Sequence, residues 1–312
     1  MRRILWLSAL FISGLALAQY PLQVQHDAGQ TVIPKQPERI VVLGEELMEL
    51  LIPLGVKPVG YGSSRLNGAR VGGKVEGLTY YRPEEIGPAV FVGDAYTQPN
   101  LEAITALKPD LILFWATAPK SVAETLKKIA PTVGWDYNRD EKVGWRRAFS
   151  ETARILGREK QAEEALKRYT QQLEAYRSRA APFVARMPRV TVLFFYNEET
   201  TGIFGPRFGF SIALTRLGFE LAGIPGVSIP DRSYAPISTE MLLNVQSDWA
   251  LYLRPKSPDG RYPELTSERM LKQSKVPIYR FLLDVQEPQS GPITDLRRIE
   301  GILRLLEAGA QK

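Results

Sequence analysis

The chain has 312 residues, of which 44% are hydrophobic and 24% are charged, with a formal net charge of +6 and no cysteine. This composition is that of a globular protein with room for two domains, which excludes disordered and fibrous folds. The positive charge is mild and is not concentrated in a basic run, so we expect no nucleic-acid partner.

The N-terminal segment has the pattern of a secretory signal. Arg2 and Arg3 precede an apolar run that ends in Ala16-Leu17-Ala18, and this run is too short to cross a bilayer. We therefore expect residues 1–18 to be a cleaved signal peptide. Because it lacks cysteine, the mature chain can receive neither a disulfide nor a cysteine-linked lipid, so we expect a periplasmic protein that is not lipidated.

The mature chain contains the same succession of elements twice. The first copy opens with an apolar strand at 39–43 and a helix at 46–54, and the second opens with a strand at 189–193 and has a helix at 211–217. Both helices end in Leu-Gly followed by an apolar residue, which is typical of a glycine C-cap. The repeat predicts two similar lobes.

Further elements repeat with equal spacing. Glu102 lies in the first turn of a short helix that precedes a strand at 110–114, and Glu240 lies in the first turn of one that precedes a strand at 248–252. Each of these helices begins at a good N-cap residue, Asn or Ser. Strands that alternate with helices predict an α/β fold, in which each lobe is a mainly parallel sheet flanked by helices.

A long amphipathic helix separates the two copies. Its apolar residues between Glu159 and Arg179 lie on one helical face, and at about 1.5 Å per residue the helix spans roughly 30 Å, enough to cross from one lobe to the other. We expect an N-terminal lobe at 19–157, a connecting helix at 158–182 and a C-terminal lobe at 183–312.

Motifs of common enzymes are missing from the sequence. It contains no phosphate loop, no dinucleotide-binding glycine pattern and no nucleophile elbow. Its one histidine is His26, which we expect to be exposed near the mature N-terminus and not to serve as a catalytic base. We expect a protein that is not an enzyme and has no cofactor. The shortage of His and Cys argues against a bare transition-metal ion, so a metal in the cargo would arrive already chelated.

Sequence motifs of one family extend over nearly the whole mature chain. They are found at 33–43, 54–60, 98–102, 107–112 and 129–133. On these residues the sequence resembles the class III periplasmic binding proteins for ferric siderophores, haem and cobalamin. The resemblance implies two α/β lobes joined by a single long helix, with the ligand in a shallow cleft between them. It also implies capture of an iron chelate, in the first place a ferric siderophore, by a monomer that serves an ABC importer.

The same resemblance implies how the protein docks on its importer. In this family a glutamate on each lobe contacts arginines of the membrane permease subunits, and the matching positions are Glu102 and Glu240. Stabilisation of two helix starts would also explain these glutamates. Their equivalent placement in the two halves favours docking.

Residues that follow the strands are the candidates for ligand binding, because ligands of open α/β sheets lie outside the carboxyl ends of the strands. Aromatic rings and arginines suit a ferric chelate, whose periphery is flat and apolar and whose metal centre often carries negative charge. The candidates are Glu45, Arg65, Tyr96 and Trp115 in the first lobe and Tyr196, Arg207, Phe208, Tyr252 and Arg254 in the second. Arg207 ranks first because a glycine-bounded loop holds it beside an aromatic ring.

Other cargoes and a different class of protein stay open at this stage. Haem or cobalamin could be bound, and haem iron could take a ligand from one of three tyrosines, Tyr96, Tyr196 or Tyr252. A secreted two-lobed hydrolase would instead use carboxylates such as Glu45, Asp94 and Glu198. No acid–base pair is spaced within a motif, which argues against the hydrolase.

Overall fold

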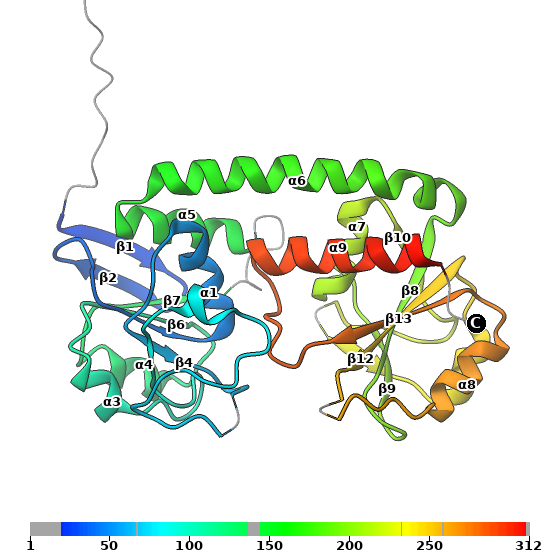
Figure 1. The fold of residues 1–312 in the computed structure, drawn as a ribbon, viewed down its shortest axis with the longest axis horizontal. Coiled ribbons are helices and arrows are strands. Elements are labelled where there is room, and N and C mark those ends of the chain that lie inside the picture. Colours follow the sequence, from blue (N-terminus) through cyan, green and yellow to red (C-terminus); the bar gives the residue numbers. More distant parts are fainter. Residues whose placement is uncertain (1–19, 67, 137–143, 232, 258, 310–312) are drawn as a thin grey trace, which may run out of the picture.

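Two sheets, each flanked by helices, lie side by side in the computed structural model (Figure 1). The structure describes residues 20–66, 68–136, 144–231, 233–257 and 259–309. The expected two-lobed α/β fold is confirmed. The predicted signal peptide lies outside the described residues.

The N-terminal sheet is parallel throughout, in the order β5-β4-β3-β6-β7. Its central strands are continuous apolar runs, as expected where both faces of a parallel sheet are covered. The strands are β3 (Ile40–Leu43), β4 (Gly60–Gly62), β5 (Val90–Phe91), β6 (Leu111–Trp115) and β7 (Thr132–Trp135). The helices are α1 (Glu45–Leu51), the 3₁₀ helix η1 (Ile52–Leu54), α2 (Pro83–Ile86), α3 (Leu101–Ala106), α4 (Lys120–Leu126) and α5 (Trp145–Leu156).

A β-hairpin that the sequence analysis did not predict precedes this sheet. β1 (Leu22–His26) and β2 (Gly29–Ile33) pair antiparallel and contact β7. The hairpin encloses His26, whose exposed fraction is 7%, so the expectation of an exposed histidine is wrong.

Backbone donors hold His26 in its neutral form. Nδ1 accepts hydrogen bonds from the N–H groups of Ala28 and Gly134, and Nε2 lies 3.0 Å from Thr31 Oγ1. A protonated ring could accept neither of the two N–H bonds. Burial lowers the pKa of His26 to about 4, with a further contribution from the charge of Lys127.

The C-terminal sheet has the order β11-β9-β8-β12-β13, and β10 pairs with β8 outside this path. β9 and β11 are antiparallel additions to an otherwise parallel sheet. The strands are β8 (Arg189–Phe195), β9 (Thr201–Phe204), β10 (Glu220–Leu221), β11 (Tyr234–Pro236), β12 (Trp249–Pro255) and β13 (Ile278–Leu283). The helices are α7 (Gly209–Leu217), the 3₁₀ helix η2 (Thr239–Asn244), α8 (Thr266–Gln273) and α9 (Pro292–Ala308).

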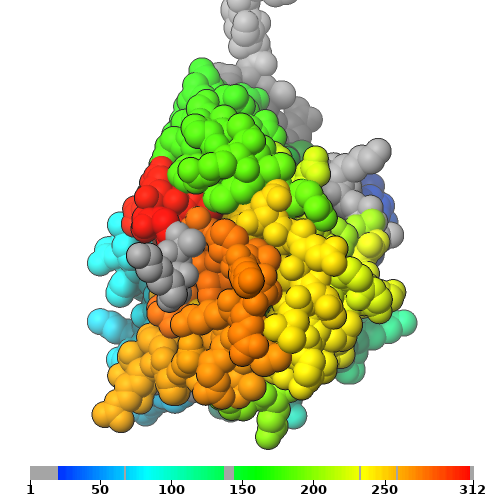
Figure 2. All heavy atoms as spheres, turned by 90° about the vertical axis from the view of Figure 1, so that its right-hand side faces the viewer, coloured from blue at the N-terminus to red at the C-terminus, as the bar shows by residue number. Residues whose placement is uncertain are grey.

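The covalent connection between the sheets is α6 (Glu159–Arg186). It forms the upper edge of the molecule, with α9 beneath it, in both overall views (Figures 1 and 2). The buried side chains of α6, among them Tyr169, Leu173 and Tyr176, form the face that packs on α5, α7 and α9. Pro182 lies inside the helix. It removes one N–H donor near the C-terminal end, and the helix continues to Arg186.

A second, non-covalent bridge lies between the lobes. Residues 284–291, which we call the strap, lead from β13 to the edge of the N-terminal half and from there to the start of α9 (Figure 1). The hydroxyl of Thr79 donates to the Asp284 carboxylate at 2.7 Å, and its N–H donates to Gln286 at 2.8 Å. The strap thereby fixes the C-terminal lobe to the first lobe at a place that α6 does not reach.

Glu49 of α1 anchors the far end of the strap. One carboxylate oxygen accepts the N–H groups of Ile293 and Thr294 in the first turn of α9, at 2.6 and 3.0 Å, and the other accepts the hydroxyls of Thr294 and Tyr81. The side chain of Glu49 is fully buried. Burial raises its pKa to about 7 despite these hydrogen bonds. A glutamate of one lobe therefore caps a helix of the other.

Candidate functional site

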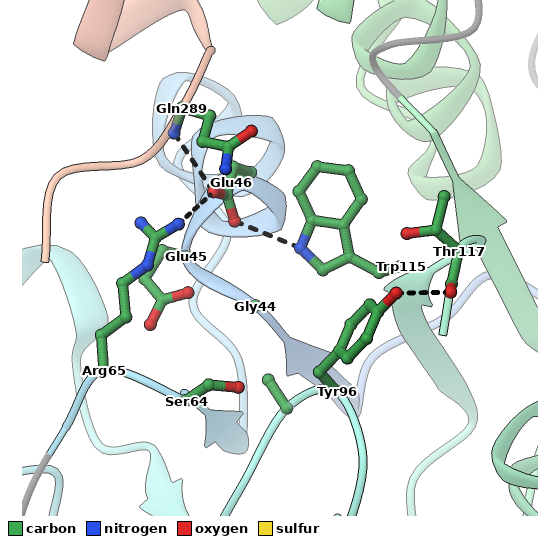
Figure 3. Close-up of a pocket in the computed structure, with 10 residues that line it drawn as sticks. Gly44, Glu45, Glu46, Ser64, Arg65, Tyr96, Trp115, Thr117 and Gln289 are labelled. Atoms are coloured by element: carbon green, nitrogen blue, oxygen red, sulfur yellow. Dashed lines mark hydrogen bonds and ion pairs between the residues drawn. The ribbon is translucent and has the colours of Figure 1, made fainter. Parts of the chain in front are cut away.

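A cavity of about 330 Å³ opens where the carboxyl ends of β3, β4 and β6 face the strap. Its lining includes an acidic pair, one arginine and two aromatic rings (Figure 3). The lining residues are Gly44, Glu45, Glu46, Ser64, Arg65, Ala95, Tyr96, Trp115, Thr117 and Gln289. The strand-end rule of the sequence analysis thus leads to a real hollow.

Glu46 lies at the centre of the hydrogen bonds in this cavity. Its carboxylate accepts from Arg65 at 3.1 Å, from the indole Nε1 of Trp115 at 3.2 Å and from the backbone N–H of Gln289 at 3.1 Å (Figure 3). Only 2% of Glu46 is exposed. Three donors, one of them cationic, compensate for the burial of the charge. They also fix the positions of Arg65, Trp115 and the strap around it.

Glu45 is buried beside Glu46 but has a different partner. Its carboxylate accepts a hydrogen bond from the hydroxyl of Ser63, and its backbone oxygen accepts one from Tyr81 at 2.6 Å. Burial raises the pKa of the Glu45 carboxyl, and the neighbouring charge of Glu46 raises it further. Two adjacent carboxyls of one helix start therefore supply an acidic wall.

Trp115 and Tyr96 form the aromatic side of the cavity. The Tyr96 hydroxyl donates to the backbone oxygen of Thr117 at 2.6 Å, which holds the ring over the end of β6 (Figure 3). Gly44 permits the close approach of the indole. It has φ of +130°, and a Cβ there would lie 2.8 Å from Trp115 Nε1. A larger residue at this position would displace the ring.

The C-terminal half presents a cluster of aromatic rings, which we call the aromatic face. Phe204 and Phe208 stack with centroids 3.6 Å apart, and Phe194 packs against Tyr196 at 5.8 Å and against Tyr234 at 6.4 Å. Tyr196 and Tyr234 are 58% and 41% exposed. Exposed rings gathered at strand ends are typical of a ligand-binding surface.

The strap brings the aromatic face next to the acidic wall. Gln289 donates its N–H to Glu46, while its backbone oxygen accepts from Arg298 at 3.2 Å. That oxygen also lies close to Gly209, the residue after Phe208, because a Cβ on Gly209 would be 2.6 Å from it. The strap therefore connects the acidic wall with the start of α7, next to Phe208.

The structure gathers four of the predicted first-lobe candidates in the cavity, namely Glu45, Arg65, Tyr96 and Trp115. In the second lobe, Tyr196 and Phe208 belong to the aromatic face. Arg207 lies beside this face, with Nη2 3.6 Å from the Asp231 carboxylate and its N–H bonded to the Asp231 backbone oxygen. It is not one of the residues that line the cavity.

Two predicted contacts need correction. Tyr252 is 3% exposed and stacks on Phe195 inside the C-terminal core, and Arg254 is 7% exposed and paired with Glu268 at 3.1 Å. They fail as cleft residues because β12 continues to Pro255, so Tyr252 lies in the middle of a strand that is flanked by β8 and β13. Arg254 also donates to the backbone oxygen of Pro263, in the segment that leads into α8.

Six of the residues that line the cavity are not among the candidates named from the sequence, namely Gly44, Glu46, Ser64, Ala95, Thr117 and Gln289. Ser64 adjoins Arg65 on the loop after β4, and Thr117 follows β6 by two residues, so the strand-end rule could have found both. Gln289 reaches Glu46 from 243 positions away. No local pattern marks it.

The carboxylates considered for a hydrolase do not come together. Asp94 is used by its own loop, where it accepts the N–H groups of Tyr96 and Thr97 at 2.8 and 2.6 Å. Glu198 is exposed and accepts the N–H of Thr266. Within the described ranges, no group of three or more His, Cys, Asp or Glu side chains is placed to hold a metal ion.

The two glutamates considered for docking are exposed, one on each lobe. Glu102 lies in the first turn of α3, and Glu240 lies in the first turn of η2, which contacts α8. α3 and α8 both lie on the side of the molecule opposite α6 (Figure 1). The hydrogen bond from its own N–H, followed by that from the Ser238 hydroxyl, lowers the pKa of Glu240.

Comparison with known families gives a match over most of the chain. A family model described as periplasmic binding protein matches residues 40–275. None of the helices in the described part of the chain is long and apolar enough to span a membrane.

Individual proteins of known name are similar as well. The chain is 28% identical over 208 residues to an ABC transporter substrate-binding lipoprotein of Bacillus subtilis, covering 65% of this chain and 59% of that protein's length. It is 28% identical to the ferric enterobactin-binding periplasmic protein of Escherichia coli, over 72% of this chain and 70% of the relative. A siderophore-binding protein of Vibrio cholerae, solved with Fe3+-Desferal, superimposes with a TM-score of 0.68 at 24% identity, over 88% of this chain and 99% of that one.

Proposed function

The chain belongs to the periplasmic binding protein family, and from that premise we propose that it holds a ferric siderophore between its lobes and delivers it to an ABC importer. The observation that carries this proposal is the cleft itself. A polar, hydrogen-bonded cavity lies at the strand ends of one sheet, a cluster of aromatic rings lies at the strand ends of the other, and the strap contacts both halves. Such a combination suits a ligand that is large, mostly apolar and fixed by a few polar contacts.

Iron enters this cleft as a finished complex. The Glu46 carboxylate already has three donors, and the Glu45 carboxylate accepts the Ser63 hydroxyl, so neither is arranged as a ligand for an empty coordination position. Relatives named for ferric enterobactin and for Fe3+-hydroxamate support a chelate as cargo. The role of the protein is binding without chemical change, and no cofactor is needed for it.

Delivery depends on the two exposed glutamates, Glu102 and Glu240. A double substitution of both by alanine is expected to leave ligand affinity unchanged and to abolish import into cells that rely on this protein. The matched control replaces Glu163 and Glu164, two exposed glutamates of α6 on the opposite side of the molecule. Equal import by the docking variant and the control would refute this role.

The site of action is the periplasm. Residues 1–18 direct export and are removed, and the absence of cysteine leaves the mature protein without a lipid anchor. The Bacillus relative is a lipoprotein, so this chain would differ from it in that respect. Mass spectrometry of the secreted protein tests the point, with a mature N-terminus at Gln19 and no added lipid as the expected result.

Tryptophan fluorescence tests binding directly. Trp115 lines the cavity, whereas Trp135, Trp145 and Trp249 are at most 1% exposed. We expect saturable quenching with ferric siderophores and none with cobalamin or haemin. A Soret band in the purified protein, or binding of haemin alone, would identify haem instead of a siderophore as the ligand. A tyrosine such as Tyr96 would then be the ligand of the haem iron.

A further inference from the structure

The charges that line the cavity are unbalanced toward the negative side. Its lining contains two carboxylates, Glu45 and Glu46, and one guanidinium, that of Arg65. Arg65 forms its ion pair with Glu46 at 3.1 Å. Glu45 accepts from the neutral hydroxyl of Ser63 instead. Because Arg65 compensates the charge of Glu46, the carboxylate of Glu45 is the excess negative charge among the residues that line the cavity.

Three cations of the C-terminal half that lie near strand ends are matched by carboxylates as well. Arg207 lies 3.6 Å from Asp231, and Lys256 lies 3.5 Å from Asp284 in the strap. Arg254 is buried with Glu268. An anionic ligand would have to displace the carboxylates that already pair with these cations. The acidic wall would still repel such a ligand.

The remaining surface of the cleft is apolar and aromatic. The exposed rings of Tyr196 and Tyr234 offer faces and edges without charge, and the partly buried Phe208 stacks on Phe204 beneath them. Such rings favour an uncharged organic periphery and attract cations by their faces. The two walls therefore agree in the charge that they accept.

Ferric chelates differ in this charge. Three hydroxamates neutralise trivalent iron, so a tris-hydroxamate complex is uncharged, and it becomes cationic where its backbone bears an amine. Three catecholates give a trianion. Placing a trianion against buried carboxylates combines like-charge repulsion with loss of hydration, and both disfavour binding.

We propose that the cleft selects ferric chelates without net negative charge, of the hydroxamate or amine-bearing class, and that Glu45 is the residue that sets this selection. The proposal rests on the proposed function, because it presumes that a ferric chelate is the cargo. Glu46 has a separate role, since its charge is compensated by Arg65 and its carboxylate positions Trp115 and the strap.

A charge series on one iron-binding scaffold tests the proposal. The probes are ferric Desferal, whose free amine is cationic, its N-acetyl derivative, which is neutral, and its N-succinyl derivative, which is anionic. Calorimetric titration of the purified mature protein is expected to give dissociation constants that rise by about tenfold or more from the amine to the succinyl form. Ferric enterobactin, a trianion, is expected to bind more weakly than all three.

Glu45→Gln is expected to reduce the difference between the amine and succinyl forms to less than about threefold, because it removes the charge and keeps an acceptor for Ser63. Glu84→Gln, at an exposed glutamate of α2 outside the cavity, removes the same charge and is expected to preserve the full difference. Circular dichroism establishes that each variant is folded. The series on the unsubstituted protein stands even if Glu45→Gln does not fold.

Two outcomes overturn different parts of the account. If the succinyl form or ferric enterobactin binds as tightly as the amine form, selection by charge is wrong and the siderophore function stands. If no ferric chelate binds saturably, the proposed function itself is wrong, and the inference falls with it.

Discussion

The two walls of the cleft consist of different kinds of side chain, buried carboxylates on one and exposed aromatic rings on the other. On the N-terminal side, Glu45 and Glu46 are buried and hydrogen-bonded, and Glu46 fixes an arginine, an indole and the strap. On the C-terminal side, Tyr196 and Tyr234 are exposed rings that contact other rings. The comparison teaches that one wall is specialised for discrimination by charge and the other for contact area.

The walls also differ in what a substitution can do. A buried carboxylate with several partners supports the fold, so its removal affects stability together with binding. An exposed ring supports little of the fold, so its removal affects binding almost alone. The predictions below test this difference, from the largest expected effect to the smallest.

Glu49→Ala is expected to be the most damaging substitution on the N-terminal side. It leaves the N–H groups of Ile293 and Thr294 buried without their acceptor and empties the space of a side chain, at a cost of about 3 kcal/mol in the free energy of unfolding. Urea denaturation followed by circular dichroism measures it. Glu49→Gln keeps one acceptor oxygen and should lose less than half as much. Equal losses would mean that the cap is unimportant.

Arg65→Met is the next largest change. Met retains most of the apolar stem but leaves Glu46 buried without its cation, which we expect to cost about 2 kcal/mol in unfolding free energy and to weaken chelate binding. Urea denaturation measures the change in stability, and calorimetric titration with a ferric chelate measures the change in binding. Arg82→Met, at an exposed arginine of the same half, is the control and should lose less than about 0.5 kcal/mol. A stable Arg65→Met protein would show that the charges of this wall are not interdependent.

Tyr196→Ala tests the aromatic face. The ring is 58% exposed, so the variant should keep its unfolding free energy within about 0.5 kcal/mol. We expect its affinity for a ferric chelate to fall by about tenfold, the value of one well-placed ring. Leu243→Ala, an exposed apolar residue of η2, controls for loss of surface area and should bind normally. Unchanged affinity in Tyr196→Ala would place the ligand elsewhere.

The pH dependence of stability provides the most local test, at His26. Its pKa is about 4 in the folded protein against 6.5 for an unperturbed histidine, so the unfolded chain binds more protons between these values. The contribution of His26 to the free energy of unfolding is therefore fully present above pH 6.5. It decreases by roughly 1–3 kcal/mol as the pH falls toward 4. Comparison of the wild type with His26→Gln isolates the effect, because Glu49 titrates over part of the same range with the opposite sign. Identical pH profiles would contradict the burial of a neutral imidazole.

Local sequence patterns predict the fold and four of the residues that line the cavity. Apolar runs followed by a glycine C-cap predict the strands and helices of both lobes. Glu45 and Trp115 could be found because Glu45 lies two residues after β3 and Trp115 ends β6. The rest could not, because it depends on contacts between distant segments. Gln289 reaches the cavity only through the path of the strap. Tyr252 was expected at a strand end but lies inside β12, which continues to Pro255, and it is buried.

The direct test of one ligand held between both walls is hydrogen–deuterium exchange of the mature protein with and without a bound ferric chelate. A ligand in the cleft should slow exchange in 44–46, 63–65 and 115–117 of the first lobe and, in the same sample, in 194–208 of the second. Residues of α3 and α4, outside the cavity, should keep their exchange rates. Protection confined to one lobe, or protection centred away from these segments, would contradict the account.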